Sequence, residues 1–195
     1  MKRRRRTLRQ PTVKQLETEL ARTRRRSRTA AAVRNTLFLL VTVAAAAVLV
    51  ATLLLPVLRI FGDSMEPTLN EREIVVALKG KHFSAGDIVA FYYNNKVLVK
   101  RVIGTPGDWV DIREDGTVYV NDARLEEPYI TEKAFGICDV QLPYQVPEGQ
   151  YFVMGDQRAT SVDSRASQVG CVAQEEIIGK IAVCVLPVTH IRIVK

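Results

Sequence analysis

A serine and a lysine occupy two short stretches whose residue types could support acyl transfer. Ser64 lies in FGDSMEPTL, directly after a long apolar run, and Lys100 lies in VLVKRVI. In a strand, successive side chains point to opposite faces, so Lys100 and Arg101 are expected on different sides of a sheet. One of these two charges must therefore face an apolar surface.

An apolar surface would make Lys100 a base, because desolvation disfavours the ammonium form. Lowering its pKa from about 10.4 to about 7 requires roughly 4 to 5 kcal/mol. A neutral amine within reach of the Ser64 hydroxyl would activate it as a nucleophile. Taken alone, the same residues also fit ordinary roles, with Asp63 or Ser64 capping a helical turn and Lys100 reaching solvent from an edge strand. The spacing leaves both interpretations open.

Other catalytic machineries lack sequence support. The two histidines, His82 and His190, lie in no recognisable catalytic setting, and the sequence has no Cys-x-x-Cys pair and no glycine-rich phosphate loop. We therefore expect no metal and no cofactor, and a base other than histidine.

The charge of the chain is divided unevenly. The 28 Lys and Arg residues give a net charge of +7, but residues 1–34 hold 13 of them with two acidic residues, which leaves a net −4 for residues 35–195. A nucleic-acid-binding domain should carry its positive charge on the folded part, so we expect no nucleic-acid partner.

A membrane anchor explains the basic tail better. Between Arg34 and Arg59 lie 24 uncharged residues, enough for a helix of about 36 Å at 1.5 Å per residue. A hydrocarbon core needs about 30 Å, whereas the apolar part of a cleavable signal peptide is usually shorter. The sequence predicts a basic cytoplasmic tail over 1–34, a transmembrane helix over 35–58 and an extracytoplasmic domain over 59–195. Anionic lipid headgroups are the expected partners of the tail.

Beyond Arg59, short β-rich runs alternate with turn residues, and a second long amphipathic helix is not evident. Asn94-Asn95 and Asp115-Gly116 are typical of tight hairpin turns, and Thr105-Pro106-Gly107-Asp108 is typical of a type II turn. The fold class predicted is mainly β, a single N-terminal transmembrane helix followed by a compact antiparallel domain. Strands are expected at residues 73–78, 87–93, 96–104, 109–114, 117–120, 151–156, 177–187 and 191–194.

Three blocks of this sequence resemble the bacterial type I signal peptidases, membrane-bound Ser-Lys proteases that remove signal peptides from exported proteins. The blocks are GDSMEPTL from Gly62, KRVIGTPGD from Lys100 and MGDQRATSVDSR from Met154, in that order and after an apolar segment. The resemblance implies the β fold shared by signal peptidases and SOS-repressor proteases. It also implies Ser64 as nucleophile and Lys100 as general base.

The resemblance assigns further roles within the third block. It implies that the Ser161 hydroxyl orients the Lys100 amine, and that structural support of the site comes from Gly155, Asp156, Asp163 and Arg165. Some members carry a serine at the position of Gly62 that helps to bind the oxyanion. Here the oxyanion hole must rely on the Ser64 backbone N–H and a second donor that the sequence does not identify.

The implied substrates are signal peptides of exported preproteins, which present an extended segment with small residues one and three positions before the cut. Such a segment can add to a strand edge, and shallow apolar pockets would accept its side chains. Positions that match the pocket wall of the family are Ile60, Met65, Leu98 and Val99. The resemblance further implies a single-pass protein of the cell membrane, with membrane lipids as partners and the secretion translocon nearby.

Two other readings of the whole chain remain. SOS-repressor proteases share the Ser-Lys chemistry, but they are cytosolic and carry a DNA-binding domain. A catalytically inert, membrane-tethered peptide-binding or assembly module of the same fold is the second alternative, and a cleavage assay separates it. For the thiols, a disulfide between Cys138 and Cys171 and full reduction both remain open, with Cys184 expected to be buried in a strand.

Overall fold

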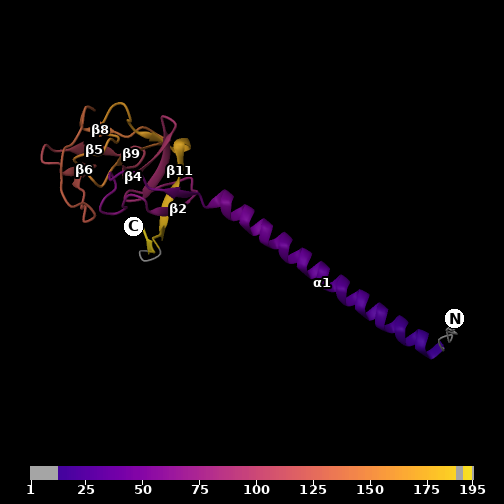
Figure 1. Ribbon diagram of the computed structural model, residues 1–195. Coiled ribbons are helices and arrows are strands. Elements are labelled where there is room, and N and C mark those ends of the chain that lie inside the picture. Colours follow the sequence, from indigo (N-terminus) through magenta and orange to yellow (C-terminus); the bar gives the residue numbers. More distant parts are fainter. Residues whose placement is uncertain (1–12, 188–190, 195) are drawn as a thin grey trace. The chain divides into compact units, whose positions relative to one another are not determined.

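The computed structural model describes residues 13–187 and 191–194, and it divides into two compact units after Ala51. The described part of the first unit lies within one helix, α1 (Val13–Leu54), and the second unit contains the strands (Figure 1). Its strands pair in antiparallel fashion. The prediction of a mainly β fold with one N-terminal helix is confirmed.

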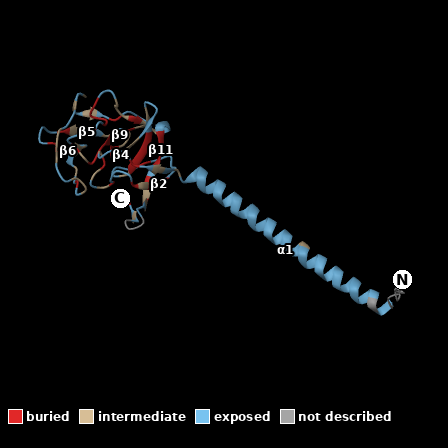
Figure 2. Ribbon diagram, viewed as in Figure 1, coloured by how far each residue is buried: buried red, intermediate tan, exposed pale blue. Residues whose placement is uncertain are grey.

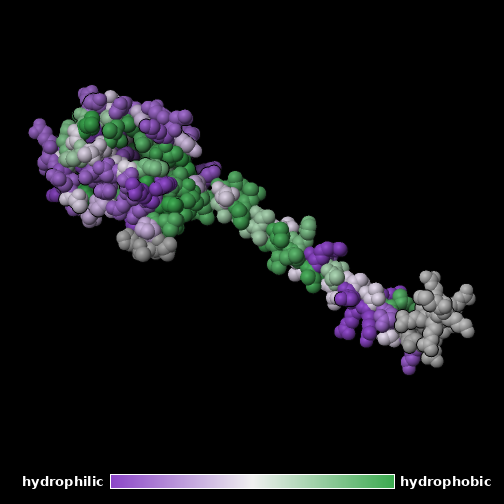
Figure 3. Space-filling model, viewed as in Figure 1, coloured by the Kyte–Doolittle hydropathy of each residue, from purple (hydrophilic) through white to green (hydrophobic). Residues whose placement is uncertain are grey.

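Helix α1 is basic near its N-terminal end and apolar over the rest of its length (Figure 3). Its large apolar side chains are exposed (Figure 2), and its stretch Leu16–Leu54 is the one described helix long and apolar enough to cross a membrane by length and composition. The predicted end at residue 58 is wrong, because the helix ends at Leu54. Pro56 cannot donate to a helical hydrogen bond and disfavours helical geometry at Leu55, so the chain leaves the helix there.

The larger sheet holds eight of the described strands. Its order is β1 (Val57–Arg59), β2 (Ile74–Leu78), β11 (Ile177–Leu186), β3 (Ile88–Tyr93), β4 (Lys96–Gly104), β9 (Gln150–Met154) and β10 (Val172–Ala173), while β12 (Arg192–Ile193) pairs with β11. Residues 57–58, expected in the membrane helix, pair instead with β2. The 3-10 turn η1 (Gln174–Glu176) leads into β11.

The smaller sheet has the order β7 (Ala123–Arg124), β6 (Val118–Val120), β5 (Trp109–Ile112) and β8 (Tyr144–Gln145). Its connection to the larger sheet depends on Gly104 at the end of β4. A Cβ atom there would lie 2.7 Å from Val110 Cγ2 and 3.0 Å from Val146 Cγ2. Only glycine therefore lets the end of β4 pack this closely against the second sheet.

The predicted hairpin turns have the backbone that their residues favour. Asn94 and Asn95 have φ angles of 45° and 64°, as a two-residue hairpin between β3 and β4 requires. This tight turn fixes the register of the two strands, in which Val89 lies opposite Lys100. Gly107, with φ of 88°, occupies the predicted positive-φ position of its turn.

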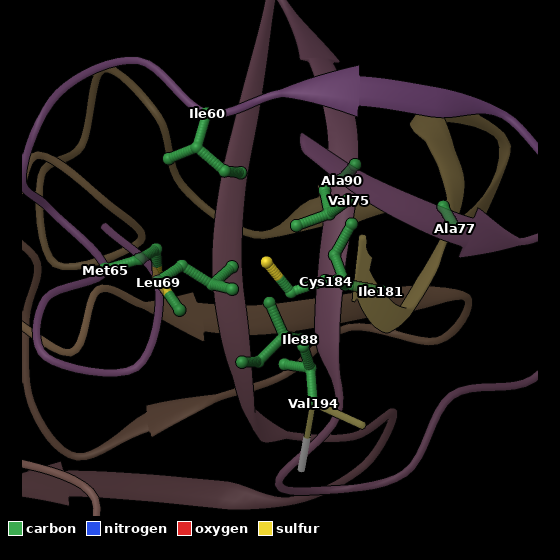
Figure 4. Packing of buried hydrophobic residues seen from close by; sticks show 10 residues of the cluster. All are labelled: Ile60, Met65, Leu69, Val75, Ala77, Ile88, Ala90, Ile181, Cys184 and Val194. Carbon is green, nitrogen blue, oxygen red and sulfur yellow. The ribbon is translucent and has the colours of Figure 1, made fainter. Parts of the chain in front are cut away.

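The hydrophobic core of the larger sheet includes residues from the segment that follows β1. Ile60, Met65 and Leu69 are buried against residues of β2, β3 and β11, as Figure 4 shows. Cys184 lies in the same cluster, which confirms its predicted burial. All three cysteines are free thiols, so the structure has the reduced alternative rather than a Cys138–Cys171 disulfide.

Candidate active site

Ser64 lies in a compact turn that follows β1. The turn is closed by backbone hydrogen bonds from Glu66 N to Asp63 O (2.9 Å) and from Leu69 N to Met65 O (2.9 Å). Gly62 enters it with a φ angle of 79°, a conformation that favours glycine. Since Met65 and Leu69 are anchored in the core, the turn holds Ser64 in a defined place.

Strand β4 brings Lys100 to this turn. The Lys100 Nζ atom lies 2.7 Å from the Ser64 Oγ atom, although 36 positions separate the two residues. Lys100 is only 3% exposed. The structure therefore brings together the two residues that the sequence predicts as base and nucleophile, at hydrogen-bond distance.

Burial lowers the pKa of Lys100 from 10.5 to about 8. The charge of Asp163 opposes this effect, and the charge of Arg165 adds to it. No carboxylate among the described residues forms an ion pair with the Lys100 amine. The neutral amine needed for proton abstraction is consequently a major species near pH 8.

The neighbouring Arg101 is also buried, but it has a carboxylate partner. Its guanidinium binds both oxygens of Asp156, at 2.9 Å from Nε and 2.8 Å from Nη2. A third bond runs from Nη1 to the carbonyl oxygen of Gly86 (2.8 Å). Because side chains alternate along the strand, Arg101 lies on the face where it pairs with Asp156, and Lys100 lies on the other face, next to Ser64.

Asp156 also connects this ion pair to the turn that carries Ser64. Its Oδ2 atom accepts a hydrogen bond from the Thr68 hydroxyl, and Arg101 Nη2 lies 3.3 Å from the same hydroxyl oxygen. Strand β4 and the turn are therefore joined next to the Lys100–Ser64 contact.

Asp163 and Arg165 form the buried pair expected from the third block. Arg165 donates from Nε to Asp163 Oδ1 (2.8 Å) and from Nη2 to Oδ2 (2.9 Å). Burial alone would raise the pKa of Asp163, but the hydrogen bonds and charge of Arg165 hold it below its usual range. Asp163 Oδ2 also accepts from Gly155 N (2.9 Å), so the pair fixes the chain beside the site.

Gly155 of the third block lies close to Ser64 and Ser161. A Cβ atom there would lie 2.2 Å from Ser161 Oγ and 2.6 Å from the Ser64 carbonyl oxygen. Ser161 is buried beside it, but its Oγ atom makes no hydrogen bond to the Lys100 amine. The expected bond from Ser161 to the amine is absent from this arrangement, and its orienting role stays a prediction.

The backbone N–H of Ser64 is a candidate donor for an oxyanion. The Ser64 carbonyl accepts from Gln157 N (3.1 Å), whereas the Ser64 N–H donates to no acceptor of the described residues. An amide free to bind a developing negative charge next to the nucleophile is what acyl transfer needs.

An apolar groove of about 620 Å³ opens beside Ser64. All four residues predicted for the substrate pocket line it, and two of them, Ile60 and Met65, also belong to the buried core. The remaining wall comes from β1, the start of β4 and the turn before Ser64. Its lining comprises Val57, Leu58, Arg59, Ile60, Phe61, Gly62, Ser64, Met65, Lys96, Val97, Leu98 and Val99.

A third buried ion pair, between Glu127 and Arg158, was not predicted from the sequence. Their side chains are 0% exposed, with Arg158 Nη2 and Glu127 Oε1 2.5 Å apart. Tyr129 lies close by, with the Arg101 guanidinium 3.9 Å from its ring centroid. Arg158 belongs to the third block, which the sequence analysis identified. Its partner Glu127 lies 31 positions away, in a loop whose sequence shows no distinguishing pattern.

Known proteins resemble this chain over most of its length. The family model described as signal peptidase, peptidase S26, matches residues 33–186. Signal peptidase I of Bacillus amyloliquefaciens is 37% identical over 142 residues, which are 67% of this chain and 76% of that protein. Signal peptidase IB of Staphylococcus aureus (strain COL) is 38% identical over 141 residues, covering 62% and 72%. A crystal structure of a signal peptidase I from Enterococcus faecalis V583 is 34% identical, covers 51% of this chain and 97% of its own, and has a TM-score of 0.42.

Proposed function

The chain belongs to the signal peptidase I enzymes of peptidase family S26, and we propose that it cuts preproteins as a membrane-anchored Ser-Lys endopeptidase. The observation that carries this proposal is the 2.7 Å contact between Lys100 Nζ and Ser64 Oγ in a buried setting. A charged lysine could not accept the proton of the Ser64 hydroxyl, and a distant lysine could not reach that proton.

In the first half of the reaction, Ser64 Oγ attacks the carbonyl carbon of the scissile peptide bond and its proton passes to Lys100 Nζ. The oxyanion is bound by the Ser64 backbone N–H. The C–N bond then breaks, and the Lys100 ammonium gives its proton to the departing amine. The N-terminal part of the substrate is left as an ester on Ser64.

In the second half, Lys100 is neutral again and takes a proton from water as the water oxygen attacks the ester carbonyl. The C–O bond to Ser64 breaks, and the proton returns to its oxygen. Both halves use the same base, and no step requires a metal or a cofactor. Ser161 is proposed to orient the amine, while Asp156, Asp163, Arg165 and Gly155 support the site.

The groove supports binding of an extended, small-residue segment. Strand β9 pairs with β4 from Arg101 onward, so the Lys96–Lys100 part of β4 is unpaired on that side among the described strands. A signal-peptide segment can add to this edge through main-chain hydrogen bonds. The apolar wall of Ile60, Met65, Leu98 and Val99 would then accept alanine-sized side chains near the cut.

The proposed domain organisation places this chemistry at a membrane surface. We propose residues 1–34 as a cytoplasmic tail, the apolar part of α1 after Arg34 as the membrane span, and the β unit as the extracytoplasmic catalytic domain. Confinement to one bilayer surface raises the effective concentration of enzyme and substrate. Membrane lipids and a nearby secretion translocon are the partners that this arrangement implies.

A cleavage assay tests the proposal. The full chain in detergent should cut a preprotein after an Ala-x-Ala site, and Ser64→Ala and Lys100→Met should each lower the rate at least about 10³-fold. Ser84→Ala and Lys81→Met, at exposed positions outside the groove, are the matched controls and should keep the rate. Binding without cutting by the unaltered chain would favour an inert peptide-binding module.

A further inference from the structure

The loop after β7 carries two residues, Glu127 and Tyr129, that contact Arg158 in the turn after β9 and Arg101 in β4. Glu127 is 8% exposed as a residue, and its side chain is completely buried. The Tyr129 hydroxyl donates to Glu127 Oε1 at 3.2 Å. A loop would not be expected to bury a carboxylate unless that carboxylate bound a specific partner.

Arg158 is that partner, and it connects the loop to Gly155. Its Nη2 atom binds Glu127, and its Nε atom donates to the Gly155 carbonyl oxygen at 2.9 Å. Because the guanidinium is planar, fixing Nη2 on the carboxylate also fixes the direction of the Nε bond. The position of Glu127 thereby restricts the position of the Gly155 carbonyl.

Gly155 in turn lies against the nucleophile with no free space. A Cβ atom at this position would meet the Ser64 carbonyl oxygen at 2.6 Å, and the neighbouring Gln157 N–H donates to that same oxygen. Any shift of the 155–158 turn is consequently transmitted to the backbone of Ser64.

Tyr129 also contacts β4, the strand that carries Lys100. Its ring lies 3.9 Å from the guanidinium carbon of Arg101, the residue after Lys100. Arg101 binds Asp156, which lies in the same 155–158 turn. The loop therefore contacts the turn through Glu127 and the base strand through Tyr129.

Stability alone explains this pair poorly. Glu127 Oε2 and Arg158 Nη1 are buried without a hydrogen-bond partner in the described structure. A buried ion pair with unsatisfied atoms is often no more stable than apolar residues of the same volume. What such a pair does supply is one defined geometry for the groups attached to it.

We propose that Glu127 and Arg158 are positioning residues, which hold Gly155 and through it Ser64 in the geometry needed for attack. Neither residue lines the groove. Their loss is therefore expected to lower kcat while leaving KM nearly unchanged. This inference rests on the cleavage activity proposed above.

The test compares Glu127→Gln with Asp108→Asn in the full chain, using the same preprotein. Asp108 is a carboxylate that closes the Thr105–Asp108 turn away from the groove, so its substitution measures an acid-to-amide change that affects stability only. At a temperature where both variants are folded, kcat of Glu127→Gln should fall about 10-fold or more with KM within about twofold of the unaltered chain, because displacements near 1 Å can cost about 10²-fold. Asp108→Asn should keep kcat.

A folded Glu127→Gln with unchanged kcat, or one whose loss lies in KM, would overturn the proposal. If Glu127→Gln does not fold, Arg158→Lys keeps the charge but loses the paired Nη2 and Nε bonds, and it must show the same fall in kcat. The unaltered chain and Ser64→Ala are measured in parallel. Cleavage by Ser64→Ala would refute the proposed function itself, which is a different result from normal cleavage by the Glu127 and Arg158 variants.

Discussion

Lys100 and Arg101 are consecutive residues of β4, and both are buried, but only Arg101 has a carboxylate partner. Arg101 binds Asp156 through two hydrogen bonds, whereas the Lys100 amine lies against the Ser64 hydroxyl. The two charges are 2% and 3% exposed. Burial disfavours both charges, but the Asp156 carboxylate compensates this cost for Arg101, whereas the Lys100 amine has no ion-pair partner among the described residues. This difference is the physical origin of the proposed base.

The first prediction concerns the pH dependence of cleavage. With a pKa of about 8 in the free enzyme, the Lys100 amine is neutral above this value and protonated below it, so kcat/KM should rise with pH and level off above it. At pH 7 about a tenth of the plateau rate is expected, since one pH step changes the neutral fraction about tenfold. Initial rates from pH 6 to pH 9.5 measure this. A flat profile would exclude a titrating base.

The second prediction is that Lys100 destabilises the fold at neutral pH. Its pKa is 10.5 in the unfolded chain and about 8 in the folded one, so the unfolded state binds more protons between these values and stability rises with pH across that window. Below about pH 8 the full cost, about 3 kcal/mol, is present. Lys100→Met should therefore unfold at higher denaturant concentration at pH 7, with a gain that shrinks between pH 8 and 10.5.

Denaturant titration at pH 7 and pH 10.5 checks this, with Lys81→Met as the control at an exposed position. A stability gain of equal size at both pH values would indicate better packing of methionine rather than relief of a buried charge.

The third prediction concerns the close approach at Gly155. In Gly155→Ala the added methyl group would overlap Ser161 Oγ and the Ser64 carbonyl oxygen, at 2.2 and 2.6 Å. We expect a loss of about 1 to 3 kcal/mol of stability and a fall in kcat of at least about 10²-fold. Gly80→Ala is the control, because its Cβ atom meets nothing closer than 3.7 Å. Cleavage at the normal rate by Gly155→Ala would show that this contact is not needed.

The sequence predicted the strands that alternate over several residues, but of the two-residue strands it predicted only β12, within residues 191–194. Strands β7, β8 and β10 have two residues each, too few for any periodic pattern. Strand β1 was hidden because its residues continue the apolar run of the helix, and only Pro56 marks the change. Local composition thus identified the long elements, while tertiary pairing formed the short ones.

The site, too, contains residues that the sequence predicted and contacts that it did not. Ser64 and Lys100 belong to recognisable blocks, and strand alternation separated Lys100 from Arg101. The contacts of Glu127 with Arg158 and of Tyr129 with Arg101 span 31 and 28 positions and arise only from the folding of a loop. No spacing within the sequence encodes them, so they could not be predicted from it.

The fourth prediction tests the ion pair behind the base. Asp156→Asn leaves the buried Arg101 charge without its counter-charge, which typically costs about 3 to 5 kcal/mol. Replacing both residues, by Arg101→Met with Asp156→Leu, should be less destabilising than the single change. Denaturant titration of the two variants gives this comparison. A double variant less stable than Asp156→Asn would show that the pair contributes more than mutual neutralisation.

The most direct test of the account is an NMR titration of Lys100 in the folded chain, following the carbon next to its amine and assigned with Lys100→Met. The Ser-Lys mechanism predicts a midpoint near pH 8, well below 10.5, the ordinary value for a lysine. A midpoint near 10.5 would mean that the amine beside Ser64 is charged at working pH, and it would contradict the Ser-Lys mechanism.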